Sequence, residues 1–200
     1  MPLVEFAKEY IKARYDKPGD VFLGVCHRID RPVSGAVIFA RTSKALERMN
    51  KLFAEREIEK TYWAVVNNRP DPLSDTLVHY LDKDRDRNVT LALDAPSRRH
   101  PTAKRAELTY ELFGSLGEQH ILLVHPQTGR PHQIRAQLAK IGCPIRGDLK
   151  YGAPKANKDG SIFLHCRSMS FIHPVTKLPV EVVADVPENQ IWELFARLAD

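Results

Sequence analysis

The sequence has few cysteines and no long hydrophobic run, and each absence excludes a class of protein. Three cysteines in 200 residues are too few, and odd in number, for a disulfide framework, so we expect a reducing compartment. No stretch approaches the roughly eighteen apolar residues of a membrane span. The opening MPLVEFAKEYIKARY carries charges throughout and lacks the apolar core of a signal peptide. We therefore expect a cytoplasmic protein that does not enter membranes.

The composition is that of a folded domain. Hydrophobic residues make up 43% of the chain and charged residues 28%, which argues against a disordered or fibrous protein. No period of 20–50 residues recurs and no segment is of low complexity. A length of 200 residues suits one ordinary domain, so we expect residues 1–200 to form a single domain.

Positive charge exceeds negative charge and is unevenly placed. The formal net charge is +5, and residues 98–105 hold four cations and no acid. Residues 128–150 hold five cations and one acid, whereas the last twenty residues hold five acids and one cation. A basic cleft opposite an acidic face would suit a phosphate-backbone binder. The alternative is that these clusters are ordinary solvated surfaces.

Hydrophobic periodicity and turn residues predict a mixture of helices and strands without a regular βαβ rhythm. Residue 43, a serine, is the expected N-cap of a helix of about a dozen residues. The polar, proline-punctuated segment 83–105 is expected to be a loop or irregular hairpin. Tight connections favour antiparallel pairing, so the fold class is α+β. The other expected helices are 4–13, 131–141 and 189–199, and the expected strands are 36–40, 61–66, 107–113, 120–125, 163–172 and 180–184.

The first candidate site lies in the segment CHRIDRPVSG at residues 26–35. Asp30 stands between Arg28 and Arg31, and these cations favour its charged form. Pro32 disfavours a helical conformation at Arg31, so Asp30 is expected on a loop or extended segment. An ionised, positioned aspartate can act as a nucleophile or as an electrostatic group. The alternative is a turn aspartate in a surface ion pair.

Two further segments could face the same site. In QTGRPHQIR, a Thr-Gly turn precedes a predicted helix start, where free backbone N–H groups, Arg130 and Arg135 could bind an anion. Pro131 is the expected first helical residue. In EKTYWAVV, Tyr62 and Trp63 point to opposite faces of a strand, so one could be core and the other could stack on a base. A helix cap and simple core packing are the respective alternatives.

These segments recur together in a known family. HRIDRPVSGAVIFARTSKAL resembles the signature of the RluA-type pseudouridine synthases, usually written His-Arg-Leu-Asp-x-x-Thr-Ser-Gly. The resemblance covers roughly residues 21–184, and five ordered blocks are far more specific than one. It continues through EKTYWAVV, AELTYELF, HPQTGRPHQIRAQLAKIGCPIRGDLKYG and FLHCRSMSFIHPVT.

The resemblance implies a pseudouridine synthase catalytic fold with a largely antiparallel central sheet flanked by helices and loops. It implies that Asp30 is the catalytic aspartate, that Tyr62 packs against the target base and that Leu164 lines the uracil pocket. The basic residue that pairs with the aspartate corresponds to Arg130, with Arg135 as the alternative. We also expect substrate contacts from residues 28, 31, 132 and 135, which are Arg28, Arg31, His132 and Arg135.

The sequence departs from the family pattern in three places. Ile29 replaces the usual leucine and keeps its volume, whereas Val33 replaces the usual threonine and deletes a hydroxyl group. The strands that usually precede the region matching residues 3–15 have no counterpart, and neither does a separate RNA-binding module. We expect a catalytic domain that lacks those strands, and their loss could leave a sheet edge uncovered.

The implied reaction isomerises uridine to pseudouridine in ribosomal or transfer RNA, with Asp30 as nucleophile or base. It consumes nothing, so we expect no cofactor and no metal, and we expect a monomer. A glycoside hydrolase would need a second carboxylate, and none stands out near Asp30. A second alternative is an RNA-binding module without turnover. A third is a zinc site, for which the adjacent pairs Cys26-His27 and His165-Cys166 lack the usual spacing.

Overall fold

The computed structural model describes residues 1–198, which fall into two compact units. Unit 1 comprises Met1–Ile29, Val37–Ile58 and Ser170–Val180, and unit 2 comprises Asp30–Ala36, Glu59–Met169 and the described residues from Glu181 onward. The prediction of a single domain stays a prediction. None of the helices among residues 1–198 has both the length and the apolar character needed to cross a bilayer.

Unit 1 contains two helices and a short ladder. The elements are α1 (Leu3–Arg14), β1 (Gly24–Val25), β3 (Phe39–Ala40) and α2 (Ser43–Glu55), and β1 pairs antiparallel with β3. The predicted helices at 4–13 and from residue 43 are confirmed, but α2 is capped by Thr42 instead of Ser43. The Thr42 side chain accepts a hydrogen bond from the backbone N–H of Ala45, because its backbone is extended. Of the strand predicted at 36–40, only the last two residues form a strand, which is β3.

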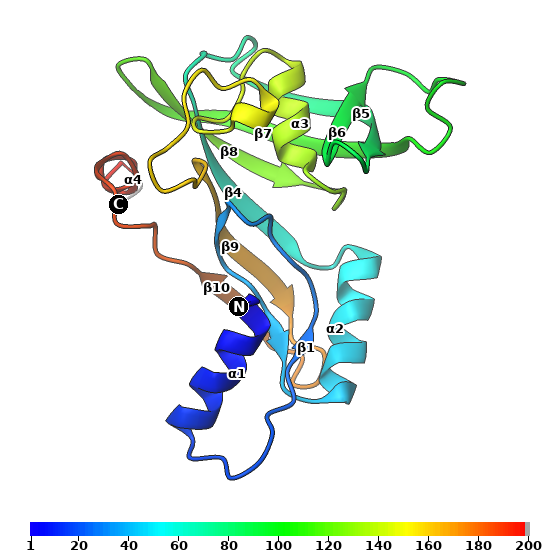
Figure 1. The fold of residues 1–200 in the computed structure, drawn as a ribbon, viewed down its shortest axis with the longest axis vertical. Coiled ribbons are helices and arrows are strands. Elements are labelled where there is room, and N and C mark those ends of the chain that lie inside the picture. The colour runs from blue at the N-terminus through cyan, green and yellow to red at the C-terminus, as the bar shows by residue number, and fades with distance from the viewer. Residues whose placement is uncertain (199–200) are drawn as a thin grey trace. The chain divides into compact units, whose positions relative to one another are not determined.

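Unit 2 is built on a long, curved sheet (Figure 1). The strand order is β10-β9-β4-β8-β7-β5-β6, with β2 parallel to β9 and antiparallel ladders from β4 to β8, β8 to β7, β7 to β5 and β5 to β6. The elements are β2 (Ser34–Gly35), β4 (Glu59–Val66), β5 (Ser74–Asp84), β6 (Val89–Leu93), β7 (Lys104–Leu116), β8 (Gln119–Pro126), α3 (Gln133–Lys140), the 3-10 helix η1 (Leu149–Tyr151) and α4 (Gln190–Ala196). Strands β9 (Leu164–Ile172) and β10 (Pro179–Val183) contain residues of both units. The predicted α+β class with a largely antiparallel sheet is confirmed.

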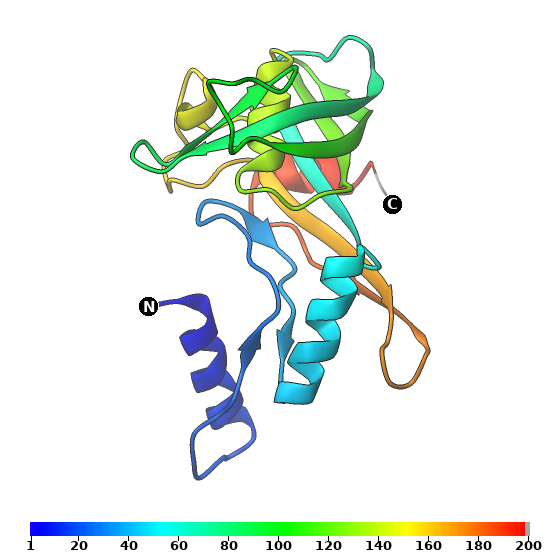
Figure 2. The ribbon, with the colours of Figure 1, turned by 90° about the vertical axis from the view of Figure 1, so that its right-hand side faces the viewer.

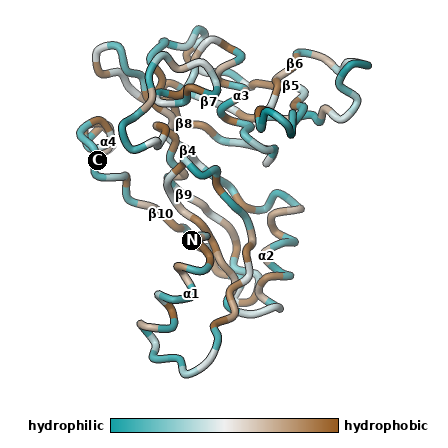
Figure 3. Tube along the Cα trace, viewed as in Figure 1, coloured by the Kyte–Doolittle hydropathy of each residue, from teal (hydrophilic) through white to brown (hydrophobic). Residues whose placement is uncertain are grey.

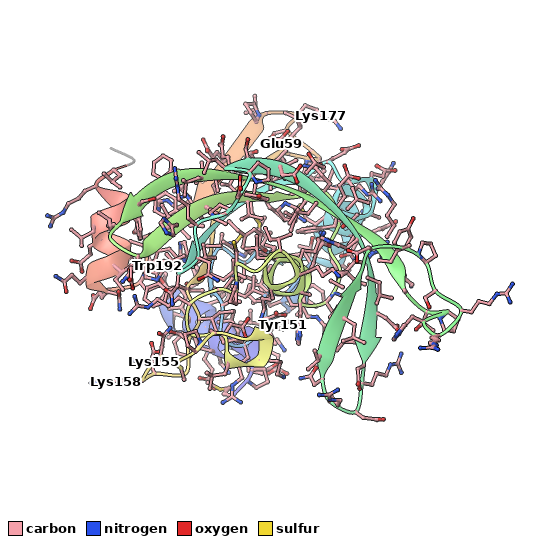
Figure 4. The ribbon with its side chains drawn as sticks, turned by 90° about the horizontal axis from the view of Figure 1, so that it is seen from above. Glu59, Tyr151, Lys155, Lys158, Lys177 and Trp192 are labelled. Carbon is pink, nitrogen blue, oxygen red and sulfur yellow. The ribbon has the colours of Figure 1, made fainter. Side chains whose placement is uncertain are left out.

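The core of unit 2 lies between the sheet and α3. Figures 2 and 4 show α3 against the curved strands, with β7 and β8 arching over it in Figure 4. Ala64, Val65 and Val66 at the end of β4 are fully buried, as is Leu138 of α3. Burial on both faces at the end of β4 explains why its last four residues, WAVV, are all apolar. Figure 3 shows the contrast with the loop between β6 and β7, which is coloured as hydrophilic.

Three expectations for this unit need correction. The segment 83–105 is more ordered than predicted, because β6 pairs with β5 and β7 already begins at Lys104. Helix α3 begins at Gln133, two residues after Pro131, because His132 adopts a left-handed conformation that interrupts the helix. The strands predicted at 107–113 and 120–125 correspond to β7 and β8, and each observed strand is longer than predicted at both ends. The closing helix is confirmed from its Asn189 cap to Ala196, and its predicted end at Ala199 lies outside the described residues.

Candidate active site

The loop that carries Asp30 is anchored to β9. A turn joins the backbone N–H of Val33 to the carbonyl of Asp30 at 2.9 Å, and β2 follows at once. In the register, Ser34 lies opposite His165 and Gly35 opposite Cys166. The Ser34 hydroxyl also contacts His165 Nδ1 at 2.8 Å. Asp30 is therefore held on a loop, one of the two predicted possibilities, and its position depends on the pairing of β2 with β9.

Gly35 is required for this pairing. Its φ is +118°, a conformation that side chains rarely adopt. A Cβ atom built on Gly35 would lie 2.3 Å from the carbonyl oxygen of Cys166, and backbone atoms cannot yield as a flexible side chain can. The Ser-Gly of the sequence motif thus lets the Asp30 loop approach β9 closely.

Arg135 joins Asp30 to a second carboxylate. Its Nη1 lies 3.0 Å from Asp30 Oδ2, while Nε and Nη2 bind the two carboxylate oxygens of Asp148 at 2.7 and 2.8 Å. Asp148 is 1% exposed, and Arg135 is 5% exposed. Burial alone would lower the pKa of Arg135, but the hydrogen bonds and charges of Asp148 and Asp30 outweigh it and raise this pKa. The guanidinium is thus a permanent, fixed cation beside Asp30.

The prediction that Arg130 pairs with Asp30 is wrong, because the structure gives this contact to the alternative, Arg135. Arg130 precedes α3, and its Nε donates to the carbonyl of Arg105 at 3.3 Å. The turn before the helix is fixed by Gln133, whose Oε1 accepts from Thr128 Oγ1 and from the backbone N–H of Arg130. This turn holds Arg130 in its own contact while the first turn of α3 presents Arg135 to Asp30.

Tyr62 and Trp63 lie on opposite faces of β4, as predicted. Trp63 is 5% exposed and packs in the core against Phe113, with the Arg167 guanidinium 4.9 Å from its ring centroid. Burial raises the pKa of Tyr62 well above its ordinary value, and the charge of Asp30 adds to this shift. Tyr62 is therefore a neutral phenol within electrostatic range of Asp30. Its predicted packing against a base stays a prediction.

A second group of side chains surrounds Asp30 from the side of α3. His132 Nε2 lies 4.0 Å from Asp30 Oδ2, and His132 Nδ1 lies 2.8 Å from the hydroxyl of Tyr151. The ring of Tyr151, labelled in Figure 4, faces Arg135, whose guanidinium carbon is 5.0 Å from the ring centroid. Tyr151 and Asp148 were not singled out from the sequence, although both lie in the block GDLKYG at residues 147–152.

Two lysines add positive charge near these residues. Lys83 Nζ binds the side-chain oxygen of Asn88 at 2.5 Å, and Lys150 Nζ binds the backbone oxygen of the same residue at 3.2 Å. Desolvation and the neighbouring Lys150 lower the pKa of Lys83, and the charge of Asp30 also acts on it. Asn88, in the turn between β5 and β6, thus binds two ammonium groups, one from β5 and one from η1.

The remaining predicted residues are more scattered. Arg31 is exposed at the turn after Asp30, Leu164 is 3% exposed within the core, and Arg28 is an exposed residue of unit 1. The predicted substrate contacts of these residues stay predictions. Among residues 1–198 no three His, Cys, Asp or Glu side chains are grouped as metal ligands would be, so the zinc alternative gains no support.

The sequence and the fold of the chain match those of known proteins. The sequence profile of the family described as RNA pseudouridylate synthase matches residues 4–140, and the chain belongs to this family. It is 33% identical over 170 residues to an uncharacterized RNA pseudouridine synthase of Mycobacterium bovis, covering 83% of this chain and 53% of that protein. It is 33% identical to tRNA pseudouridine synthase C of Vibrio vulnificus over 86% of this chain and 75% of that protein.

A third relative is ribosomal large subunit pseudouridine synthase C of Vibrio cholerae, 28% identical over 84% of this chain and 53% of that protein. The solved structure of human RNA pseudouridylate synthase domain containing 4 matches with a TM-score of 0.79 at 22% identity. That match covers all of this chain and 84% of the human chain, and it shows the shared fold. The chain spans about half the length of the first curated relatives it matches.

Proposed function

We propose that this protein isomerises specific uridines to pseudouridine in structured RNA. The observation that carries the proposal is the partly exposed carboxylate of Asp30, fixed by the buried cation of Arg135 in a chain of this family. The N-glycosidic bond between N1 and C1′ breaks, the uracil turns, and C5 bonds to C1′ while the proton of C5 is lost and N1 gains one. No oxidant or reductant is consumed.

Asp30 is the group that acts on the nucleoside, either as a nucleophile at C1′ or as a base on the ribose. Arg135 holds this carboxylate in place through the contact of 3.0 Å between its Nη1 and Asp30 Oδ2. Tyr62 supports the proposal as a neutral, half-buried ring in range of Asp30, suited to stacking on uracil, which contributes on the order of 1–3 kcal/mol per base. The target nucleotide leaves its stack to reach this site.

The RNA substrate is ribosomal or transfer RNA, because the named relatives include synthases for both. Lys83 and Lys150 are the cations we assign to the phosphates near the target nucleotide, and the exposed Arg98, Arg99, Lys104 and Arg105 extend this basic surface along the chain. We further propose that the protein acts in the cytoplasm.

Release of tritium from RNA that carries 5-tritiated uridine tests the reaction, because C5 loses its hydrogen only if the new bond forms. We expect release by the wild-type chain and none by Asp30→Asn. The matched control is Asp86→Asn, an exposed hairpin carboxylate, which should keep full release. Release that persists in Asp30→Asn would refute its role, and RNA binding without release by the wild type would favour a non-catalytic binding module.

A further inference from the structure

His132 occupies a backbone conformation that the helix does not need. Its φ of 52° and ψ of 24° are left-handed, and its side chain makes no hydrogen bond to cap α3. Residues other than glycine seldom adopt this conformation, and those that do concentrate at functional sites. The conformation places the imidazole between Tyr151 and Asp30, so the contacts of the ring, not the helix start, explain why a histidine stands here.

The hydrogen bonds around Tyr151 are compatible with one tautomer of His132 that the proposal below uses. The backbone N–H of Thr90 donates to the Tyr151 oxygen at 2.8 Å, while the Thr90 hydroxyl donates to the carbonyl of Pro131 at 3.0 Å. We assign the phenol hydrogen of Tyr151 to His132 Nδ1, which lies 2.8 Å from the phenol oxygen. A neutral imidazole that accepts at Nδ1 carries its hydrogen on Nε2, which is the nitrogen that faces Asp30.

The surroundings of His132 favour this neutral form. Burial lowers the pKa of His132, and the cations Arg135, Lys83 and Lys150 lower it further, whereas Asp30 raises it. Tyr151, whose own pKa is raised by burial, faces the ring as an uncharged phenol.

The two oxygens of Asp30 have different surroundings. Arg135 Nη1 at 3.0 Å and His132 Nε2 at 4.0 Å both face Oδ2. Among the described residues, no hydrogen bond or ion pair is made to Oδ1. The separation to His132 exceeds a hydrogen bond, and such contacts often shorten only when substrate binds.

We propose that His132, oriented by Tyr151, is a positioning residue that directs its Nε2–H at Oδ2 of Asp30 and thereby leaves Oδ1 as the oxygen that acts on the nucleoside. The inference rests on the proposed function for the role of Asp30. Its structural half, the Tyr151–His132–Asp30 arrangement, does not depend on any RNA.

Nitrogen NMR of histidine-labelled protein tests the structural half. We expect the His132 signals of a neutral Nε2–H tautomer at pH 7. Tyr151→Phe keeps the ring over Arg135 but removes the hydroxyl, so the tautomer should become mixed. A hydrogen on Nδ1 in the wild type, or signals unchanged in Tyr151→Phe, would overturn the proposal whether or not the protein modifies RNA.

Tritium-release kinetics test the functional half. His132→Asn suits the left-handed backbone but is too short to reach Asp30, so we expect kcat to fall about five- to tenfold, the worth of one hydrogen bond, with KM unchanged. His132→Gln, whose amide N–H can reach, should recover most of kcat. The matched control is His173→Asn in unit 1, expected to have wild-type kinetics.

The outcomes separate this inference from the proposed function. Loss of release in Asp30→Asn together with unchanged kcat in His132→Asn would overturn the inference and leave the proposed function standing. Absence of release by the wild type would contradict the proposed function, and the inference with it, while the NMR result would still decide the orientation of His132.

Discussion

Arg135 shows how a single side chain couples stability to the candidate chemistry. It lies in the core of unit 2, where an unpaired charge would be costly, and its two carboxylate partners are 13 and 105 positions away in the chain. Asp148 takes two of its nitrogens, which leaves the third for Asp30. Asp148 is therefore expected to matter for folding as well as for activity.

Replacing Asp148 with asparagine should destabilise the protein by about 3–5 kcal/mol, because it leaves the Arg135 charge buried with one weakened partner. Urea denaturation measures the change. The control is Asp94→Asn, because Asp94 forms an exposed ion pair with Lys140, with a side chain 74% exposed. We expect no measurable change there, and equal losses in the two variants would contradict the assignment.

The buried thiol of Cys166 should make the free energy of unfolding depend on pH in the alkaline range. Burial raises the pKa of its thiol from 9.0 to about 11. In the unfolded chain the thiol ionises near its ordinary pKa, so its contribution to stability is complete below pH 9 and is lost as the pH rises through about 11. The predicted loss is on the order of 2–3 kcal/mol.

The measurement is the difference in unfolding free energy between wild type and Cys166→Ala at several pH values. We expect this difference to shrink between pH 8.5 and pH 11. The partly exposed Cys26 provides the comparison, and Cys26→Ala should show a weaker dependence. A difference for Cys166→Ala that is independent of pH would contradict the prediction.

At the scale of elements, the two-residue strand β2 positions the candidate site. Its parallel pairing with β9 places the preceding loop, and with it Asp30. The same pairing brings Cys166 beneath Gly35, where only a hydrogen fits. The geometry of the candidate site is thus set by a short ladder that local sequence periodicity cannot reveal.

Gly35→Ala should disrupt this ladder. The positive φ alone costs about 1–3 kcal/mol, and the clash with the Cys166 backbone adds to it. The control is Gly129→Ala, which has no positive φ and no atom within 4 Å of the added Cβ. Thermal unfolding should show a clear loss for Gly35→Ala and little change for the control, and similar midpoints would show that β2 can shift at no cost.

At the scale of the whole molecule, part of the excess positive charge lies near Asp30 in unit 2. Lys83, Lys150 and Arg135 all act electrostatically on His132 next to Asp30. Because Asp148 neutralises Arg135 in part, the two lysines are the cations available to phosphates. Removal of these two lysines should therefore change the salt dependence of RNA binding as well as the rate of the chemical step.

The double variant Lys83→Gln/Lys150→Gln should bind bulk tRNA less tightly and with a shallower salt dependence. Two lost phosphate contacts reduce the slope of log K against log salt by about 1.4–1.8. The control is Lys155→Gln/Lys158→Gln, since both lysines lie well apart from Tyr151 in Figure 4. Filter binding at several salt concentrations measures both, and equal slopes would contradict the assignment.

The sequence by itself determined the elements whose signals are local. The helices at 3–14 and 43–55 and the strand β4 follow from periodicity, and the position of Asp30 outside a helix follows from Pro32. The ordered motifs also determined the family. These features depend on residues close together in the chain, so the sequence carries them directly.

Only the tertiary structure decided which arginine contacts Asp30 and which residues hold that arginine in place. Arg130 and Arg135 are equivalent by residue type, but Arg130 precedes α3, whereas Arg135 lies in its first turn and is buried. The contact between Arg135 and Asp30 spans 105 positions, and Asp148 and Tyr151 come from the cap and the end of η1. Such contacts are set by the packing of distant segments, which no local pattern encodes.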